Sequence, residues 1–455
     1  MLRVPRAAVA AAFTLALTAP AAAQTTTTVP GVPAAGPATY DRSFVTKIGP
    51  ASADTVLVLM PGYNGGAGDF GLVGRDIVER VPGLQVWAVD RRSQALEDTS
   101  MFDRAARGAA TPQQAFDYYL GALANPAYAG PRFAPPDLSK LGFVADWGLP
   151  TALGDVRRVV LAARRAGKRV ILGGHSLGAS MTAIYAAWDF GGGRAGYEDV
   201  DGLVLIDGGA LGSFARVASV ADARRRLAEV RKQPFADLIG LGLPWAQGVF
   251  AALGGLYADK LPLERSPFSD FALLPAQFKP PVPATNRAFL GHAFDKTTSP
   301  RALGLIQLRA GGLAPSGDPR DWVDGEVSPI ARVARFWAQS PVNGVEWYFP
   351  ERLRLDVDAA NELRPTAVAR ELGLRLRHLR EVDVPLYAFQ TDLTDGRVLR
   401  GARRLIAASR VPRGRSTLVD RSTSTSHLDP LTAAPETNDF LKTVVPFLRR
   451  VSGRR

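Results

Sequence analysis

Short runs of aliphatic and β-branched residues alternate, in the first half of the chain, with stretches whose apolar residues recur every three or four positions. The short runs are typical of buried strands, often parallel ones, and the repeating stretches are typical of helices with one apolar face. The predicted strands span 55–60, 84–89, 169–173 and 202–206. The predicted helices span 69–80, 151–166 and 177–190. This order predicts an α/β fold, with a mostly parallel central sheet and helices on both of its faces.

The alternation stops after residue 206 and resumes near residue 384. Two further strands and a final helix are then predicted, at 384–389, 416–419 and 438–450. We therefore expect an α/β core formed by residues 41–210 and 381–455. Residues 211–380 are expected to form a mainly helical cap that lies over one edge of the sheet.

The first 23 residues have the pattern of a secretory signal peptide. Arg3 and Arg6 supply positive charge, and the apolar run at 7–17 is shorter than the roughly 20 residues that span a bilayer. Small residues at 21–23 suit cleavage before Gln24. Residues 24–40, rich in Thr, Pro, Ala and Gly, are expected to be a flexible leader. We expect the mature protein to be secreted or periplasmic.

The motif that carries chemistry is Gly174-His175-Ser176-Leu177-Gly178, which has the form G-x-S-x-G. It lies between a predicted strand and a predicted helix, which is the context that gives this short pattern its meaning. A sharp strand-to-helix turn there would lift the Ser176 hydroxyl above the sheet. Small residues two positions to either side leave room for the strained backbone of such a turn. Ser176 is therefore the candidate nucleophile.

With this motif in place, the chain resembles the α/β-hydrolase superfamily, and more specifically its secreted esterases and lipases with a large cap. The resemblance covers residues 55–209 and 384–450 and does not extend to the insertion. It implies an acyl-enzyme mechanism without any cofactor. It also implies that nucleophile, acid and histidine follow one another in that order along the chain.

His427 is the expected general base, because a neutral serine is a weak nucleophile and needs a base beside it. His427 follows the last predicted strand in a polar loop, which is where the resemblance implies the base. His175 lies inside the motif and would point away from the serine hydroxyl. His292 and His378 fall within the insertion.

Three aspartates are candidates for the acid that orients the base. Asp395 is preferred, because the resemblance implies an aspartate shortly before a small apolar residue in the loop after the strand at 384–389, and Asp395 precedes Val398 there. Asp392 in the same loop is the second candidate. Asp207, directly after the strand at 202–206, is the third.

Two backbone N–H groups are needed to stabilise the oxyanion of the tetrahedral intermediate. Leu177, which follows the nucleophile, is expected to supply one of them. Tyr63, which follows Pro61-Gly62 in the loop after the first strand, is expected to supply the other.

A competing motif lies in the same loop. Gly66, Gly68 and Gly71 form a G-x-G-x-x-G pattern, and Asp90 ends the next strand about twenty residues on. This pattern resembles a dinucleotide fingerprint and would indicate a nicotinamide-dependent dehydrogenase. The first glycine comes too late after the strand for that motif, and an exported protein would lack a supply of the cofactor.

Composition narrows the function classes further. The formal charge is +12, but only eight of the 55 basic residues are lysine and the arginines are spread along the chain, so we expect no nucleic-acid partner. The chain has no cysteine and four histidines, which excludes thiolate chemistry and disfavours a histidine-rich metal site. The expected activity is hydrolysis of a hydrophobic carboxylic ester, as in lipases or polyester hydrolases. A lipid interface, amide or peptide cleavage and acyl transfer by the same residues stay open.

Overall fold

The structure, a computed structural model, describes residues 24–214, 216–340 and 343–453. The predicted signal peptide at 1–23 lies outside the described residues.

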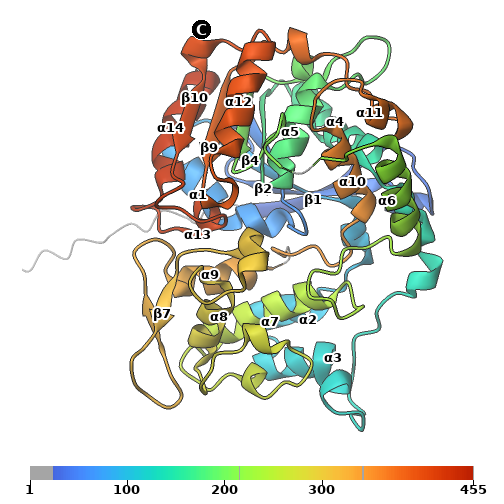
Figure 1. Ribbon diagram of the computed structural model, residues 1–455. Coiled ribbons are helices and arrows are strands. Elements are labelled where there is room, and N and C mark those ends of the chain that lie inside the picture. The colour runs from blue at the N-terminus through green and yellow to red at the C-terminus, as the bar shows by residue number, and fades with distance from the viewer. Residues whose placement is uncertain (1–23, 215, 341–342, 454–455) are drawn as a thin grey trace, which may run out of the picture.

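The central sheet has eight strands in the order β1-β2-β4-β3-β5-β6-β9-β10 (Figure 1). Their bounds are β1 (Gln24–Pro30), β2 (Arg42–Ile48), β3 (Thr55–Met60), β4 (Leu84–Asp90), β5 (Arg169–His175), β6 (Gly202–Ile206), β9 (Leu386–Gln390) and β10 (Thr417–Asp420). The pairs from β4 to β10 are all parallel, whereas β2 pairs antiparallel with β1 and with β4. The predicted fold class, a mostly parallel sheet of the α/β-hydrolase type, is confirmed.

Strand β1 corrects the expectation of a flexible leader at 24–40. Residues 24–30 form the edge strand of the sheet, and Val32 is held by a 2.8 Å hydrogen bond from its N–H to the Asp155 carboxylate. Four consecutive threonines favour an extended backbone, because β-branched side chains suit a strand. Most of β1 is exposed, so no alternation of apolar and polar residues marked it in the sequence.

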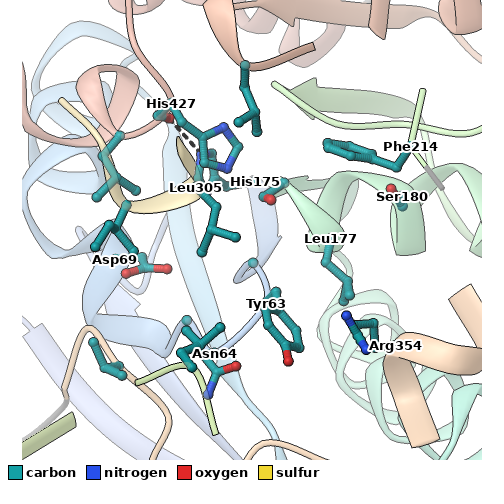
Figure 2. Close-up of a pocket in the computed structure, with 18 of the residues that line it drawn as sticks. Tyr63, Asn64, Asp69, His175, Leu177, Ser180, Phe214, Leu305, Arg354 and His427 are labelled. Atoms are coloured by element: carbon teal, nitrogen blue, oxygen red, sulfur yellow. Dashed lines mark hydrogen bonds between the residues drawn. The ribbon is translucent and has the colours of Figure 1, made fainter. Parts of the chain in front are cut away.

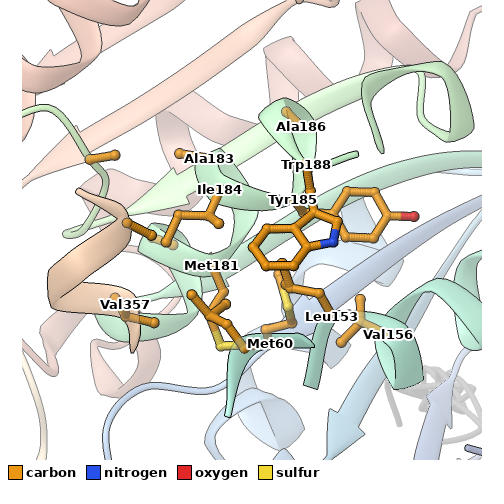
Figure 3. Packing of buried hydrophobic residues seen from close by; sticks show 14 of the residues in the cluster. Met60, Leu153, Val156, Met181, Ala183, Ile184, Tyr185, Ala186, Trp188 and Val357 are labelled. Carbon is orange, nitrogen blue, oxygen red and sulfur yellow. The ribbon is translucent and has the colours of Figure 1, made fainter. Parts of the chain in front are cut away.

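Helices cover both faces of the sheet. Helices α1 (Gly71–Arg80) and α14 (Asp439–Ser452) pack on one face, and α4 (Leu149–Arg165), α5 (Leu177–Ala187) and α12 (Arg397–Ala408) pack on the other. Figure 3 shows the second of these layers, where Met60 from β3 and Leu153 from α4 meet Met181 and Ile184 from α5. Within the described part of the chain, no helix is long and apolar enough to cross a membrane.

The cap lies against the sheet edge at which the parallel strands end, and it is built from two segments of the chain (Figure 1). The first carries α2 (Ser100–Ala106) and α3 (Pro112–Ala124), which come before α4. The second carries α7 (Ala246–Lys260), α8 (Asn286–Phe294), α9 (Ile330–Trp337) and the hairpin of β7 (Gly311–Leu313) and β8 (Trp322–Asp324). Aromatic residues from both segments share one apolar cluster.

This arrangement differs from the predicted division of the chain in two places. Helices α2 and α3 fall within 41–210 but pack against α7 of the cap. Conversely, α6 (Val220–Lys232), α10 (Glu351–Ala360) and α11 (Ala367–Glu371) fall within 211–380 but form one packed group, in which α10 lies against α4 and α5. The predicted ranges followed the strands alone, and strands do not show on which layer an intervening helix packs.

Candidate active site

Ser176 occupies the sharp turn between β5 and α5. Its backbone angles, φ 55° and ψ −121°, are strained for a residue with a side chain. The chain fits here because Gly178 has no side chain, since a Cβ at that position would lie 2.0 Å from the Met60 carbonyl oxygen. The Ser176 N–H donates to the Ile206 carbonyl at 2.9 Å, which fixes the turn to the end of β6.

His427 lies in the loop between β10 and the short helix α13 (Asp429–Thr432), and it is 1% exposed. Its Nδ1 is 2.5 Å from Oδ2 of Asp207, which is fully buried. The Nε2 of the ring is therefore the nitrogen left to face a substrate or a nucleophile. His427 and Ser176 line the same cavity, although they are about 250 positions apart in the sequence.

The structure does not bring Asp395 to His427, which corrects the preferred choice of acid. Asp395 ends a 3-10 turn in the left-handed conformation, with φ 49° and ψ 47°, and its side chain is exposed. Asp392 is closer to the site, but its carboxylate contacts Lys296, Arg309 and Ser426 Oγ. Asp207, the third candidate, takes the position because β6 ends between the carboxyl ends of β5 and β9.

Thr391 holds the carboxylate of Asp207, a role that the sequence did not indicate. Its N–H donates to Asp207 Oδ1 at 2.8 Å, and its hydroxyl donates to Asp207 Oδ2. Burial alone would raise the pKa of Asp207, but the hydrogen bonds from His427 and Thr391 lower it below its usual value. Asp207 therefore remains an anion beside the imidazole.

His175 supports the loop of His427 from below. Its Nε2–H donates to the His427 carbonyl at 2.9 Å, and the two rings lie 4.4 Å apart between their centroids. Burial and the neighbouring His427 lower the pKa of His175 to about 3, so this ring is neutral near pH 7. The sequence did not predict this contact between His175 and the loop of His427.

The two expected oxyanion donors lie on either side of the serine. Leu177 is the first residue of α5, so its N–H has no acceptor within the helix. Tyr63 lines the cavity from the loop after β3, and its backbone N–H has no hydrogen-bond acceptor among the described residues. The phenol of Tyr63 donates to Glu351, and the ring lies edge-on to Phe349, which keeps this loop in place.

Arg91 fixes the loop that carries Tyr63. The guanidinium donates to the carbonyls of Pro61 at 2.8 Å, Gly62 at 3.0 Å and Gly65 at 3.1 Å. It also forms a 2.6 Å ion pair with Glu346 from the cap. One mostly covered cation therefore ties the candidate oxyanion loop to the cap, which the sequence did not reveal.

The cavity above Ser176 has a volume of about 370 Å³ and is walled by both the core and the cap. Figure 2 shows His427 above it, Tyr63 and Asn64 below, Leu177 and Arg354 to one side and Asp69 to the other. Most of the remaining wall is apolar, with Phe214, Leu238, Leu305, Ile306, Trp337, Val345, Val357, Leu393 and Leu428. Burial and the nearby Asp90 raise the pKa of Asp69 well above its usual value, which favours the protonated form of this carboxyl group in the wall.

The glycine pattern at Gly66, Gly68 and Gly71 serves the docking of the cap. The Gly68 N–H donates to the Asn343 carbonyl at 2.9 Å, and a Cβ on Gly68 would lie 2.3 Å from that oxygen. Asp90 is buried, and its carboxylate accepts the Ala67 N–H at 2.5 Å. The chain itself fills the place that a pyrophosphate would need, which removes the basis for the dehydrogenase interpretation.

No group of three or more histidine, aspartate or glutamate side chains in the described ranges could hold a metal ion.

No protein-family model and no curated protein matches this chain. Among solved structures, it is similar to a protein from Sulfolobus solfataricus provisionally described as a lipase, with 15% identity, a TM-score of 0.48 and 94% of each chain covered. It is similar to epoxide hydrolase VrEH1 from Vigna radiata, with 13% identity, a TM-score of 0.42 and coverage of 94% and 98%. A thermophilic esterase from Thermogutta terrifontis has 11% identity, a TM-score of 0.38 and coverage of 94% and 100%. At such identities the chemistry has to be inferred from the chain's own residues.

Proposed function

We propose that this chain, which has the α/β-hydrolase fold, is a serine hydrolase that cleaves carboxylic esters through an acyl-enzyme. The observation that carries the proposal is the buried pair of Asp207 and His427 at the cavity that contains Ser176. A serine on a strained turn, an imidazole oriented by a carboxylate and free backbone N–H groups are the parts that acyl transfer requires.

In this mechanism the Ser176 oxygen attacks the ester carbonyl while His427 Nε2 takes the hydroxyl proton. Asp207 holds the ring in the required tautomer and stabilises the imidazolium. The N–H groups of Leu177 and Tyr63 stabilise the oxyanion. His427 then gives the proton to the departing alcohol, and water, activated by the same ring, cleaves the acyl-enzyme to the free acid.

Among the described residues, the structure shows no direct hydrogen bond between the Ser176 hydroxyl and the His427 ring. Contacts of this kind are often long without substrate and shorten when it binds. Because the cavity wall is mainly apolar, an ester with a hydrophobic acyl group suits it better than a highly polar one.

We also propose that the enzyme acts outside the cytoplasmic membrane, as the N-terminal pattern at 1–23 predicts. Cleavage before Gln24 would leave the whole of the described edge strand β1 in the mature chain.

The function is tested with p-nitrophenyl esters of rising acyl length. Wild-type protein should hydrolyse them, and Ser176→Ala should lose roughly three or more orders of magnitude in kcat/KM. Ser180→Ala is the matched control, because Ser180 lines the same cavity but its hydroxyl donates to the Gly209 carbonyl at 2.6 Å. Equal rates for wild type and Ser176→Ala would contradict the proposal. Adding an alcohol acceptor and measuring the new ester separates acyl transfer from hydrolysis.

A further inference from the structure

A second cavity lies inside the cap, next to the cavity that contains Ser176. Its volume is about 110 Å³. The two cavities share four wall residues, namely Leu238, Ile306, Trp337 and Val345. The two cavities therefore adjoin, and a substrate chain that reaches the second cavity from Ser176 has to pass these four side chains.

The wall of the cap cavity is almost wholly apolar. Aromatic and aliphatic side chains from α7, α8 and the segments beside them line it, among them Phe250, Phe268, Phe289, Phe294, Leu290 and Leu303. A comparable cavity with an apolar lining stays dry and binds a molecule as large as benzene at about 150 Å³. The size and lining suit the distal part of an acyl chain.

Gln247 is the one amide side chain in this wall. Its Oε1 accepts the Leu238 N–H at 3.0 Å. Its Nε2 is buried and has no hydrogen-bond partner among the described residues, and the whole residue is 7% exposed. A buried donor without an acceptor is costly, and a bound group that supplies the acceptor recovers that cost.

We propose that the cap cavity binds the far end of an acyl chain that carries a hydrogen-bond acceptor, held by the amide of Gln247. The substrate class is then an ester whose acyl group ends in a second ester, as in an oligoester, in preference to a plain fatty acyl ester. This inference rests on the proposed function, because it names the substrate of the same site.

The test compares two p-nitrophenyl esters whose acyl groups both have chains of ten atoms, the decanoate and the ester of monomethyl suberate. Wild type should favour the suberate, with a kcat/KM about tenfold higher, because only that chain offers an acceptor to Gln247. Gln247→Met keeps the length of the side chain but removes the donor, and should bring the ratio close to one. Gln113→Met, on the exposed surface of α3, should keep the wild-type ratio. Because the ratio is taken within each protein, a general loss of activity does not affect it.

Gly254→Phe tests the cavity itself. A Cβ on Gly254 would meet its nearest neighbour, Leu290 Cδ1, at an ordinary contact distance of 3.4 Å, so a ring there would fill the cavity. This variant should lose at least about tenfold in kcat/KM for both long esters, with the acetate ester changed less than about twofold. Equal losses on all three esters, or a wild type without preference for the suberate, would overturn the inference while leaving ester hydrolysis in place.

Binding separates this inference from the proposed function. Calorimetric titration of Ser176→Ala with monomethyl suberate should show binding. Adding Gly254→Phe to this variant should abolish the binding, and adding Gln247→Met should weaken it. If wild type binds this acid but cleaves none of the esters, the cavity assignment stands and the proposed function fails. If the protein does not bind this acid but hydrolyses the esters, the proposed function stands and the cavity assignment fails.

Discussion

The Nδ1 of His427 lies 2.5 Å from the Oδ2 of Asp207, in a place where both side chains are closed to solvent. This contact assigns the proton of the neutral imidazole to Nδ1 and leaves Nε2 as the acceptor. A general base of the proposed kind needs that tautomer.

The first prediction follows from this pair. Asp207→Asn should lower kcat by about 10⁴-fold, because an amide in place of the carboxylate favours the wrong tautomer of His427. Asp395→Asn, at an exposed position, should change kcat less than about twofold. Steady-state kinetics of the two variants on a p-nitrophenyl ester measures both kcat values and shows which aspartate matters. If Asp395→Asn is the damaging variant, the geometric assignment of the acid is wrong.

The second prediction concerns Thr391, whose hydroxyl donates to the same carboxylate oxygen as His427. Thr391→Val keeps the shape and the backbone hydrogen bond but removes that donor. We expect kcat to fall about tenfold with KM nearly unchanged, since a hydrogen bond to a charged group is lost without any contact to substrate. The control is Thr437→Val, because the Thr437 hydroxyl donates to the backbone carbonyls of Val327 and Ala434. A change confined to KM would contradict a positioning role.

The sequence indicated the candidate nucleophile and the candidate base because each has a local signature. Ser176 lies in a five-residue motif between a strand and a helix, and His427 follows the last strand. The acid has no such signature, since three aspartates follow strand ends. The choice among them depends on which strand neighbours β5 and on the left-handed turn at Asp395, and neither is visible in the sequence.

The cap was predicted in outline for a similar reason. Its second segment interrupts the alternation of strands and helices and is therefore visible as an insertion. Helices α2 and α3 resemble any other helices between two strands, and only their packing against α7 assigns them to the cap. The ion pair of Arg91 with Glu346, which joins positions more than 250 residues apart, depends on that packing as well.

The third prediction concerns Arg91. Arg91→Lys keeps the charge opposite Glu346 but cannot bond that carboxylate and three carbonyls at once, because an ammonium has three N–H donors and lacks the planar fork of a guanidinium. The loop of Tyr63 should then be less well fixed, and kcat should fall about tenfold, less than the roughly hundredfold or more that loss of an oxyanion donor costs. The control is Arg75→Lys, because the guanidinium of Arg75 lies outside this loop and bonds to Gln24. Steady-state kinetics of the two variants are compared. Unchanged kcat in Arg91→Lys would show that Glu351 and Phe349 hold the loop without it.

The last prediction uses the buried His175, whose folded-state pKa is about 3 against an ordinary value of 6.5. Between these two values the unfolded chain binds a proton at this position and the folded protein does not. The free energy of unfolding therefore falls as the pH is lowered through this window, by about 1.4 kcal/mol per pH unit. Above pH 6.5 neither state is protonated, and the contribution is constant.

His175→Gln removes this titration while an amide N–H can still donate to the His427 carbonyl. The variant should be less stable than wild type at pH 7, where the packing of the imidazole is lost. The difference should shrink by about 2 kcal/mol at pH 5, because only wild type pays the cost of keeping His175 neutral. Urea unfolding at both pH values measures this, and the groups common to the two proteins cancel in the difference. A difference that does not depend on pH would mean that the folded protein binds a proton at His175 as readily as the unfolded chain does, which would contradict the prediction.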